Sequence, residues 1–218
     1  NTALTHLGCE GNELIILDVS SNTALRQLSF LNNELTTLDV SNNTALTNLY
    51  CGDNQLTSLD LSNNTALTNL YCEGNSLTSL NVSNNTALIS FHCAYNQLIH
   101  LNMKNGVTNQ LTYFNATDNP SLDCIEVNTE DVDYATENWT NANDNIDSGV
   151  EFSVVCTPDG YTYVPDNNFE QALIDLGYDD VLNDFVVSDS ISGVTLLSVI
   201  DKGISDLTGI EGFTALTE

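Results

Sequence analysis

Basic residues are almost missing from this sequence of 218 residues. Arg26, Lys104 and Lys202 are its only Arg or Lys, against 30 Asp and Glu, and the formal net charge is −27. Phosphate contacts are made mainly by Lys and Arg, so this composition argues against a nucleic-acid partner. Attachment to an anionic membrane surface is disfavoured for the same reason.

Long apolar runs are missing as well. No stretch approaches the roughly 18 consecutive apolar residues of a membrane span, so we expect no membrane insertion. The sequence has no initiator Met and no signal-peptide pattern, and residue 1 lies inside a repeat. We therefore interpret it as a mature protein or as a segment of a longer chain.

The usual signatures of catalysis are also lacking. The sequence has three histidines (His6, His92 and His100) and contains no G-x-S-x-G, H-E-x-x-H or phosphate-loop motif. Acidic pairs of the glycosidase kind are not excluded by residue type, but none stands out in so acidic a chain. We expect a protein that is not an enzyme and that needs no cofactor.

A repeat of 21 residues dominates what is present. The blocks "SNNTALTNLYCGDNQLTSLDL" (41–61), "SNNTALTNLYCEGNSLTSLNV" (62–82) and "SNNTALISFHCAYNQLIHLNM" (83–103) share the pattern L-x-x-L-x-C-x-x-N-x-L-x-x-L-x-V, and blocks 1–19, 20–40 and 104–127 fit its register. One such coil cannot bury its own apolar face, so successive coils must stack. We predict one short strand per coil at x-L-x-C, about 4.8 Å from the next strand in a parallel sheet, with turns and extended segments elsewhere.

This pattern resembles the leucine-rich repeat, in particular the Asn-, Thr- and Asp-rich variety of secreted and cell-surface proteins of Bacteroidetes-type bacteria. The resemblance implies an α/β-type repeat solenoid with mostly short parallel strands, little helix and an extracellular or cell-surface location. Residues 1–127 are the array of six coils and 128–156 resemble the family's C-terminal cap, where Tyr134, Trp139, Ile146, Val150 and Phe152 can cover the last coil. In that cap "LDCIEV…W…FSVVC" carries a cysteine pair, which implies a disulfide between Cys124 and Cys156.

The last third of the chain resembles the start of a second array. After a linker at 157–165, Pro165 and Asp166 begin an amphipathic helix that Gly177 ends, with its apolar face made by Phe169, Ala172, Leu173 and Leu176. In the family, a helix of this kind caps the N-terminal end of an array, so 166–218 are interpreted as a helical cap with the first coils of a second array. We expect a chain with tandem arrays, a fragment with arbitrary ends, or molecules that meet head to tail in a filament.

Two columns of the repeat are expected to be structural. One inward-facing position holds Cys9, Cys51, Cys72 and Cys93, and a straight row of sulfurs without a C-x-x-C pair suits core packing better than a zinc site. The second column turns the chain after each strand and pairs backbone groups that the turn leaves free. It consists of Asn12, Asn33, Asn54, Asn75, Asn96 and Asn119.

The outward positions of the strands form the concave face and are the candidate ligand site. Exposed aromatic residues beside acids could hold a protein or a glycan, although stacked Tyr side chains could instead only stabilise neighbouring strands. The candidate residues are Tyr50, Tyr71, His92, Tyr95, Tyr113, Asp53 and Glu73.

Two further positions have chemical alternatives. Asp18, Asp39 and Asp60 share a column that could collect Ca²⁺, but these carboxylates more simply accept hydrogen bonds from the next turn, and we expect no metal site. "DSI" at 189–191 resembles the O-glycosylation motif of Bacteroidetes exported proteins, with Ser190 as acceptor.

Two functions remain open. In the first, arrays build a structural or adhesive assembly at a cell surface, which could be a filament. In the second, a monomeric module binds a protein or glycan on the concave face. Fold alone does not decide between them.

Overall fold

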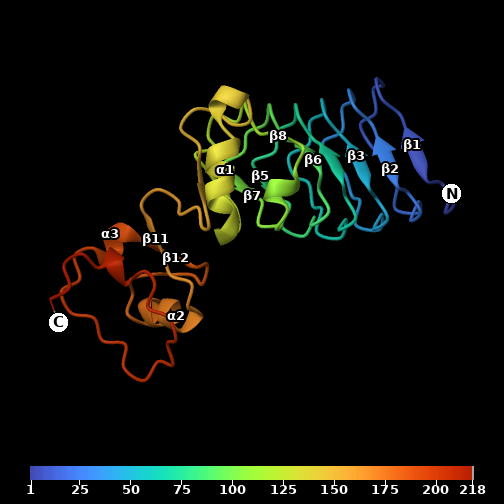
Figure 1. Cartoon of the computed structure of the whole chain (residues 1–218). Coiled ribbons are helices and arrows are strands. Elements are labelled where there is room, and N and C mark those ends of the chain that lie inside the picture. Colours follow the sequence, from blue (N-terminus) through green and yellow to red (C-terminus); the bar gives the residue numbers. More distant parts are fainter. Residues whose placement is uncertain (218) are drawn as a thin grey trace. The chain divides into compact units, whose positions relative to one another are not determined.

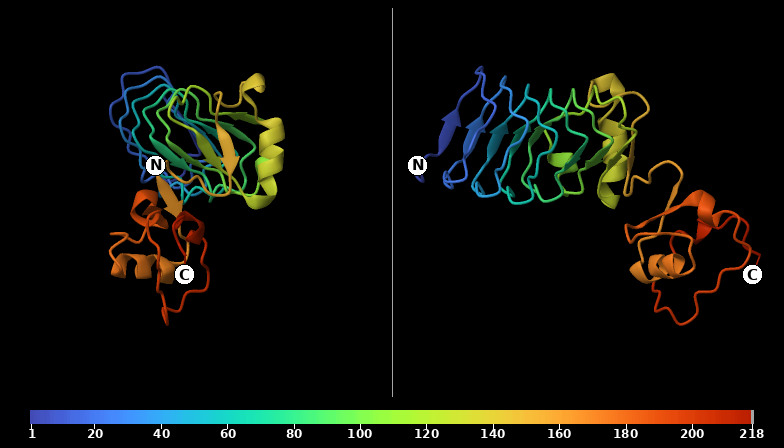
Figure 2. Two further views of the ribbon diagram at one scale, coloured as in Figure 1. Left: turned by 90° about the vertical axis from the view of Figure 1, so that its left-hand side faces the viewer. Right: turned by 180° about the vertical axis from the view of Figure 1, so that it is seen from behind.

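The computed structural model describes residues 1–217. The chain divides into two compact units, Asn1–Cys156 and Thr157–Glu218, which are described separately. Unit 1 is a solenoid of six coils with little helix, which is the leucine-rich-repeat architecture that the 21-residue period predicts. Its coils follow one another from the N-terminus towards helix α1 (Val132–Asn138), as Figures 1 and 2 show.

Six short strands form the main sheet of unit 1, and they are all parallel in the order β1-β2-β3-β4-β6-β8. The register pairs each residue with its equivalent in the next coil, so that Leu28 faces Leu49 and Leu49 faces Leu70. The central residue of each strand points inward and its neighbours point outward. The strands are β1 (His6–Gly8), β2 (Gln27–Ser29), β3 (Asn48–Tyr50), β4 (Asn69–Tyr71), β6 (Ser90–His92) and β8 (Tyr113–Asn115).

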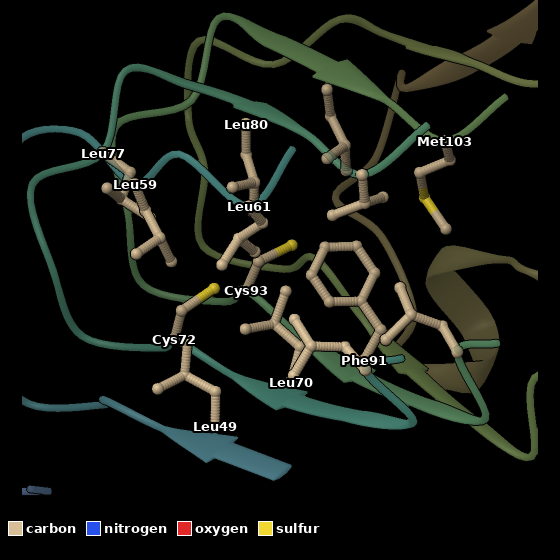
Figure 3. Packing of buried hydrophobic residues seen from close by; sticks show 14 of the residues in the cluster. Leu49, Leu59, Leu61, Leu70, Cys72, Leu77, Leu80, Phe91, Cys93 and Met103 are labelled. Carbon is tan, nitrogen blue, oxygen red and sulfur yellow. The ribbon is translucent and has the colours of Figure 1, made fainter. Parts of the chain in front are cut away.

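The core runs along the inside of the stacked coils. Leu49, Leu70 and Phe91 follow one another at the central strand position and have no exposed surface. Figure 3 shows the sulfurs of Cys72 and Cys93 pointing into the same interior, which agrees with their interpretation as packing residues. Because each side chain touches the equivalent one in the next coil, every coil completes the core of its neighbours.

Unit 1 also contains a second parallel sheet. The prediction of one strand per coil is therefore wrong for the later coils, which contribute two strands each. The second sheet has the order β10-β9-β7-β5. Three of its strands, β5 (Ser79–Asn81), β7 (His100–Asn102) and β9 (Cys124–Glu126), come from consecutive coils, and β10 (Glu151–Ser153) comes from the C-terminal cap. The first three coils have the same L-x-x-L-x-V pattern but form no strand there.

Charge disfavours a second sheet among the first three coils. The column that β5 and β7 contribute with Asn81 and Asn102 holds Asp18, Asp39 and Asp60 in the earlier coils. Pairing strands there would place like charges directly opposite one another, which destabilises a sheet. In β9 the same column holds a charge again.

That charge, on Glu126, is compensated. Its carboxylate lies 3.4 Å from Lys104 Nζ and 3.8 Å from His100 Nε2, and it accepts a hydrogen bond of 3.1 Å from the backbone N–H of Cys156. The cap strand β10 can therefore pair with β9, and the second sheet continues into the cap.

The C-terminal cap covers the last coil with an aromatic group. It includes helix α1 (Val132–Asn138) and the short 3-10 turns Thr129–Asp131 and Asn141–Asn143. Trp139, 4% exposed, lies with its ring centre 4.4 Å from Phe114 and 5.8 Å from Phe152. Cys124 and Cys156 form a disulfide that joins the last coil to the end of the cap.

Unit 2 is built around helix α2 (Asn167–Asp175). Residues 157–165, which we expected to be a linker, contain strand β11 (Tyr161–Tyr163), antiparallel to β12 (Phe185–Val187). Short helices α3 (Ser188–Ile191) and Ile210–Gly212 complete the unit.

The N-terminus of α2 is fixed by Asp166. Its carboxylate accepts hydrogen bonds from the backbone N–H groups of Asn168 and Phe169 and from the backbone and hydroxyl of Ser205. Phe169 and Leu173 are buried as predicted, whereas Leu176 is 46% exposed because it comes after the last helical turn. Gly177 follows with a positive φ of 79°, the conformation that commonly ends a helix.

Part of unit 2 has the spacing of stacked coils. The hydroxyl of Thr214 donates to the carbonyl of Ser192, and the backbone N–H of Thr217 donates to the carbonyl of Thr195. Each bond joins residues 22 positions apart. In unit 1, Thr68 makes the same kind of bond to Thr47 across 21 residues. The interpretation of this region as the first coils of a second array stays a prediction.

Candidate functional site

The candidate site lies on the strand face, which we define as the outward side chains of β1, β2, β3, β4, β6 and β8. Four rings on this face form the aromatic cluster: Tyr50, Tyr71, His92 and Tyr113. The ring centres of Tyr50 and Tyr71 are 5.4 Å apart, and Tyr71 stacks on Tyr113 at 6.2 Å with an angle of 6°. The imidazole of His92 meets Tyr71 and Tyr113 edge-on at 5.9 and 5.7 Å. The strand register therefore gathers residues from four coils into one continuous surface.

The rings of the cluster are held by polar neighbours on the same sheet. Asn48 Nδ2 donates to the hydroxyl of Tyr50 at 3.2 Å, and the hydroxyl of Tyr71 lies 2.7 Å from Ser90 Oγ. Tyr113 remains 43% exposed and no hydrogen bond of its hydroxyl is found within residues 1–217. Tyr50 and Tyr71 are thus positioned by the chain itself, which lowers the entropic cost of binding a partner to them.

Glu73 places a carboxylate beside this cluster. Its Oε2 lies 3.5 Å from His92 Nδ1, and both Glu73 Oε2 and His92 Nε2 are shielded from solvent without a hydrogen-bond partner among the described residues. The carboxylate also lies over Gly52 of the preceding coil, where a Cβ atom would come within 2.6 Å of Glu73 Oε1. The missing side chain at Gly52 therefore lets Glu73 lie against the sheet.

The imidazole of His92 does not neutralise this carboxylate at neutral pH. Burial lowers the pKa of His92 below its ordinary value, and the nearby Glu73 offsets only part of that effect. His92 is therefore uncharged at pH 7 and supplies no counter-charge to the carboxylate beside it.

Asp53 and Tyr95 lie in turns that follow the strands and not in the strands themselves. They occupy the turn after the strand, in a column of left-handed residues that includes Gly11, Asn32, Gly74 and Asp118. Gly, Asn and Asp suit this conformation, whereas Tyr95 adopts it with φ 54° and remains 63% exposed. Neighbouring Asp118 raises the pKa of the Tyr95 phenol. A bulky residue in a strained conformation is a candidate for function rather than for stability.

The predicted Asn column pairs the backbone of the turns. In Asn75, Nδ2 donates to the carbonyls of Cys51, Cys72 and Glu73, and Oδ1 accepts from the N–H of Leu56. One amide therefore pairs backbone groups of its own coil and of the preceding coil. The same pattern recurs at Asn33, Asn54, Asn96 and Asn119.

The sequence analysis missed a second Asn column on the opposite turn. Asn64, with no exposed surface, donates to the carbonyls of Val40 and Asn43, and Asn43 and Asn85 make equivalent bonds. The signal was present, because the second Asn of "SNNTAL" recurs at one position in each of the three near-identical blocks. However, the two Asn residues of "SNNTAL" recur equally, and the sequence does not show that the second is buried and the first is not.

Three thiols of the cysteine column are buried and unreactive. Burial raises the pKa of Cys51, Cys72 and Cys93 far above the ordinary value, and Glu73 adds to this. Cys9 differs, because it is only partly buried. A protonated, inaccessible thiol is a poor nucleophile and a poor metal ligand.

The carboxylates of the Asp column accept hydrogen bonds from the backbone of the following turn. Asp18, Asp39 and Asp60 each accept a bond of 2.9 Å from the backbone N–H of the Ser two residues later. Hydrogen bonds from the same Ser lower the pKa of all three carboxyls. Within residues 1–217 no group of three His, Cys, Asp or Glu side chains is arranged to hold a metal ion. Ser190, the predicted glycosylation site, is exposed on α3.

No protein-family model and no curated protein sequence matches the chain. Solved structures that resemble it include the functional domain of InlJ from Listeria monocytogenes, described as containing a cysteine ladder, at 32% identity and TM-score 0.43 over 58% of this chain. An internalin, InlF, of the same species matches at 23% identity and TM-score 0.46 over 58%, and a leucine-rich-repeat protein of Leptospira interrogans at 19% and 0.35 over 57%.

These matches span 35%, 43% and 50% of the three other chains. Among the described residues, 1–217, no helix is long and apolar enough to cross a membrane. The repeats and the strand register make residues 1–156 a parallel solenoid of stacked coils, as the leucine-rich-repeat pattern of the sequence predicts.

Proposed function

We propose that this chain is a non-catalytic, extracellular binding module that holds a protein partner on its strand face. The observation that carries the proposal is the aromatic cluster, in which four coils contribute one continuous surface of rings. Tyr is among the residues that contribute most to binding energy at protein interfaces. The disulfide between Cys124 and Cys156 supports an oxidising compartment.

The alternative that stacked Tyr residues only stabilise neighbouring strands accounts for less of the geometry. Stabilisation explains the contact of Tyr50 with Tyr71. It does not explain why Tyr113 stays 43% exposed. An exposed ring is expected where a surface is kept for a partner.

Selection from a displayed library of random cyclic peptides tests the proposal and does not require the natural partner. The library would be selected on the intact protein, and the affinity of the selected peptides would be compared with that for a variant carrying Tyr50→Ala, Tyr71→Ala and Tyr113→Ala. We expect at least a tenfold loss in the variant, with an unchanged circular dichroism spectrum. Peptides that bind both proteins equally well would refute the strand face as the binding surface.

The assembly predicted from the sequence, with arrays meeting head to tail, stays a separate prediction. Electron microscopy of the protein, beside an intact mass from the same sample, tests it. Fibres with an axial repeat of one array would support it, and discrete particles would contradict it.

A further inference from the structure

We propose that the aromatic cluster and Glu73 together form a site for one basic side chain, Lys or Arg, presented by the protein partner. This inference rests on the proposed function and names the chemical group that the same face recognises. Glycans and neutral peptides are the alternatives that the experiment must separate.

The first argument is the chemical composition of the site. The faces of Tyr50, Tyr71 and Tyr113 carry negative electrostatic potential, and a cation within about 6 Å of a ring centre is attracted to it. The contacts among these rings place them around His92, and the carboxylate of Glu73 lies 3.5 Å from that imidazole. Rings with one carboxylate beside them are the combination that holds an ammonium or guanidinium group.

The second argument is that the carboxylate is held in place but is not neutralised. Gly52 leaves the space that the Glu73 carboxylate occupies, and Glu73 Oε2 has no hydrogen-bond partner among residues 1–217. Because His92 is uncharged at pH 7, no cation in the described chain balances Glu73. One oxygen of this carboxylate is shielded and unpaired while the side chain is 21% exposed, so a bound cation could reach the group and supply the missing partner.

The third argument is charge complementarity. None of the outward residues of the six strands is Lys or Arg, and the chain carries a formal charge of −27. Such a field accelerates the approach of a cationic partner and disfavours an acidic one. It gives no advantage to a neutral glycan.

Two substitutions separate a specific site from the general field of the protein. Glu73→Gln removes the charge while the size of the side chain is kept. Glu10→Gln removes one charge from the same column three coils earlier, beside Gly8 and Ser29 instead of the rings. A third variant, Gly52→Ala, keeps the charge but displaces the carboxylate, because the new Cβ would fall within 2.6 Å of Glu73 Oε1.

The probe is a pentapeptide, Gly-Gly-Lys-Gly-Gly, blocked at both ends, with its norleucine counterpart as neutral control. Its affinity for the intact protein would be measured by NMR titration, which also reports the Tyr ring resonances. We expect the Lys peptide to shift the rings of Tyr71 and Tyr113, and affinity to fall about tenfold in Glu73→Gln and Gly52→Ala. Glu10→Gln should change it less than twofold, and the norleucine peptide should not shift the rings.

Equal losses in Glu73→Gln and Glu10→Gln, or equal binding of the norleucine peptide, would overturn the inference. The inference would also be overturned if the protein bound neutral oligosaccharides, and if this binding were abolished by Tyr71→Ala but unchanged by Glu73→Gln. That result would preserve the strand face as a binding surface for a different ligand. The proposed function itself falls only when the triple Tyr variant also binds its selected peptides normally.

Discussion

Asn75 offers the sharpest test of how the coils are held together. This side chain is 8% exposed and makes four hydrogen bonds, three from Nδ2 to carbonyls and one to Oδ1 from the N–H of Leu56. Asn75→Ala leaves a buried N–H without a partner, which costs about 1–3 kcal/mol, and removes two side-chain N–H donors, which the three carbonyls share, at roughly 0.5–1 kcal/mol each. We therefore expect a loss of about 2–5 kcal/mol in the free energy of unfolding, a large part of the stability of an ordinary domain.

The matched control is Asn12→Ala. Asn12 holds the same column in the first coil, but it is exposed and makes two bonds, to the carbonyls of Cys9 and Glu10. Its substitution should cost less than about 1 kcal/mol. Urea unfolding followed by circular dichroism and by the fluorescence of Trp139 would measure both variants. Equal losses in the two would refute the reasoning, because burial and bond number would then not set the cost.

A second substitution at the same position separates shape from hydrogen bonding. Asn75→Asp keeps the acceptor for the N–H of Leu56 but turns the amide donors into a carboxylate oxygen that faces three carbonyls. Burial and these carbonyls should raise the pKa of the new carboxyl. The variant should be destabilised at pH 7 and regain part of its stability below the raised pKa, because the neutral acid is the better-tolerated form. A pH-independent loss would contradict this.

Four further predictions concern other parts of the chain. Replacing Cys124 and Cys156 by Ser should lower stability by about 3–4 kcal/mol, given the sequence separation of 32 residues, and urea unfolding measures it. Under native conditions a thiol reagent should modify Cys9 quickly and the other three column thiols slowly, as mass spectrometry would show; equal rates would contradict their burial. Hydrogen bonds from Ser205 and from backbone groups hold the pKa of Asp166 well below its usual range. The contribution of Asp166 to stability is therefore fully present above its unfolded-state pKa of about 3.9 and is lost as pH falls through the lower pKa of the folded state. Hydrogen exchange of the α2 amides should show this loss, and Asp166→Asn should weaken the pH dependence. Asp60→Asn should extend the second sheet by one coil and slow exchange of the amide that follows it; unchanged exchange would show that charge does not set the sheet's edge.

The repeat made much of unit 1 predictable, because each column of the sequence has one environment. The position of Leu49 in the core and the hydrogen bonds of Asn75 both follow from a single coil and its copies. The second sheet could not be predicted from a single coil, because it depends on contacts between coils. Asp60 and Asn81 occupy equivalent positions in their coils, and the difference in charge between them matters only when coils with like charges stack.

The candidate site was predictable in part for the same reason. Tyr50, Tyr71 and His92 share a column and were expected to be neighbours, and the register places them side by side. Tyr95 and Asp53 come directly after the strands, in left-handed turn residues, and their assignment to the ligand site stays a prediction. The role of Gly52 could not be predicted from the sequence. Its lack of a side chain leaves space for the Glu73 carboxylate of the next coil, which is a contact between coils.

The pairing of each strand residue with its equivalent in the next coil has a consequence for how such a protein can change. The coils 20–40, 41–61, 62–82 and 83–103 are each encoded by 21 codons, and adding or removing one leaves all other columns in register. Unequal recombination between the near-identical blocks 41–61 and 62–82 would therefore lengthen the row of Tyr residues by one ring without disturbing the core. A gene of this kind can vary the extent of its recognition surface by copy number, before any point mutation is selected.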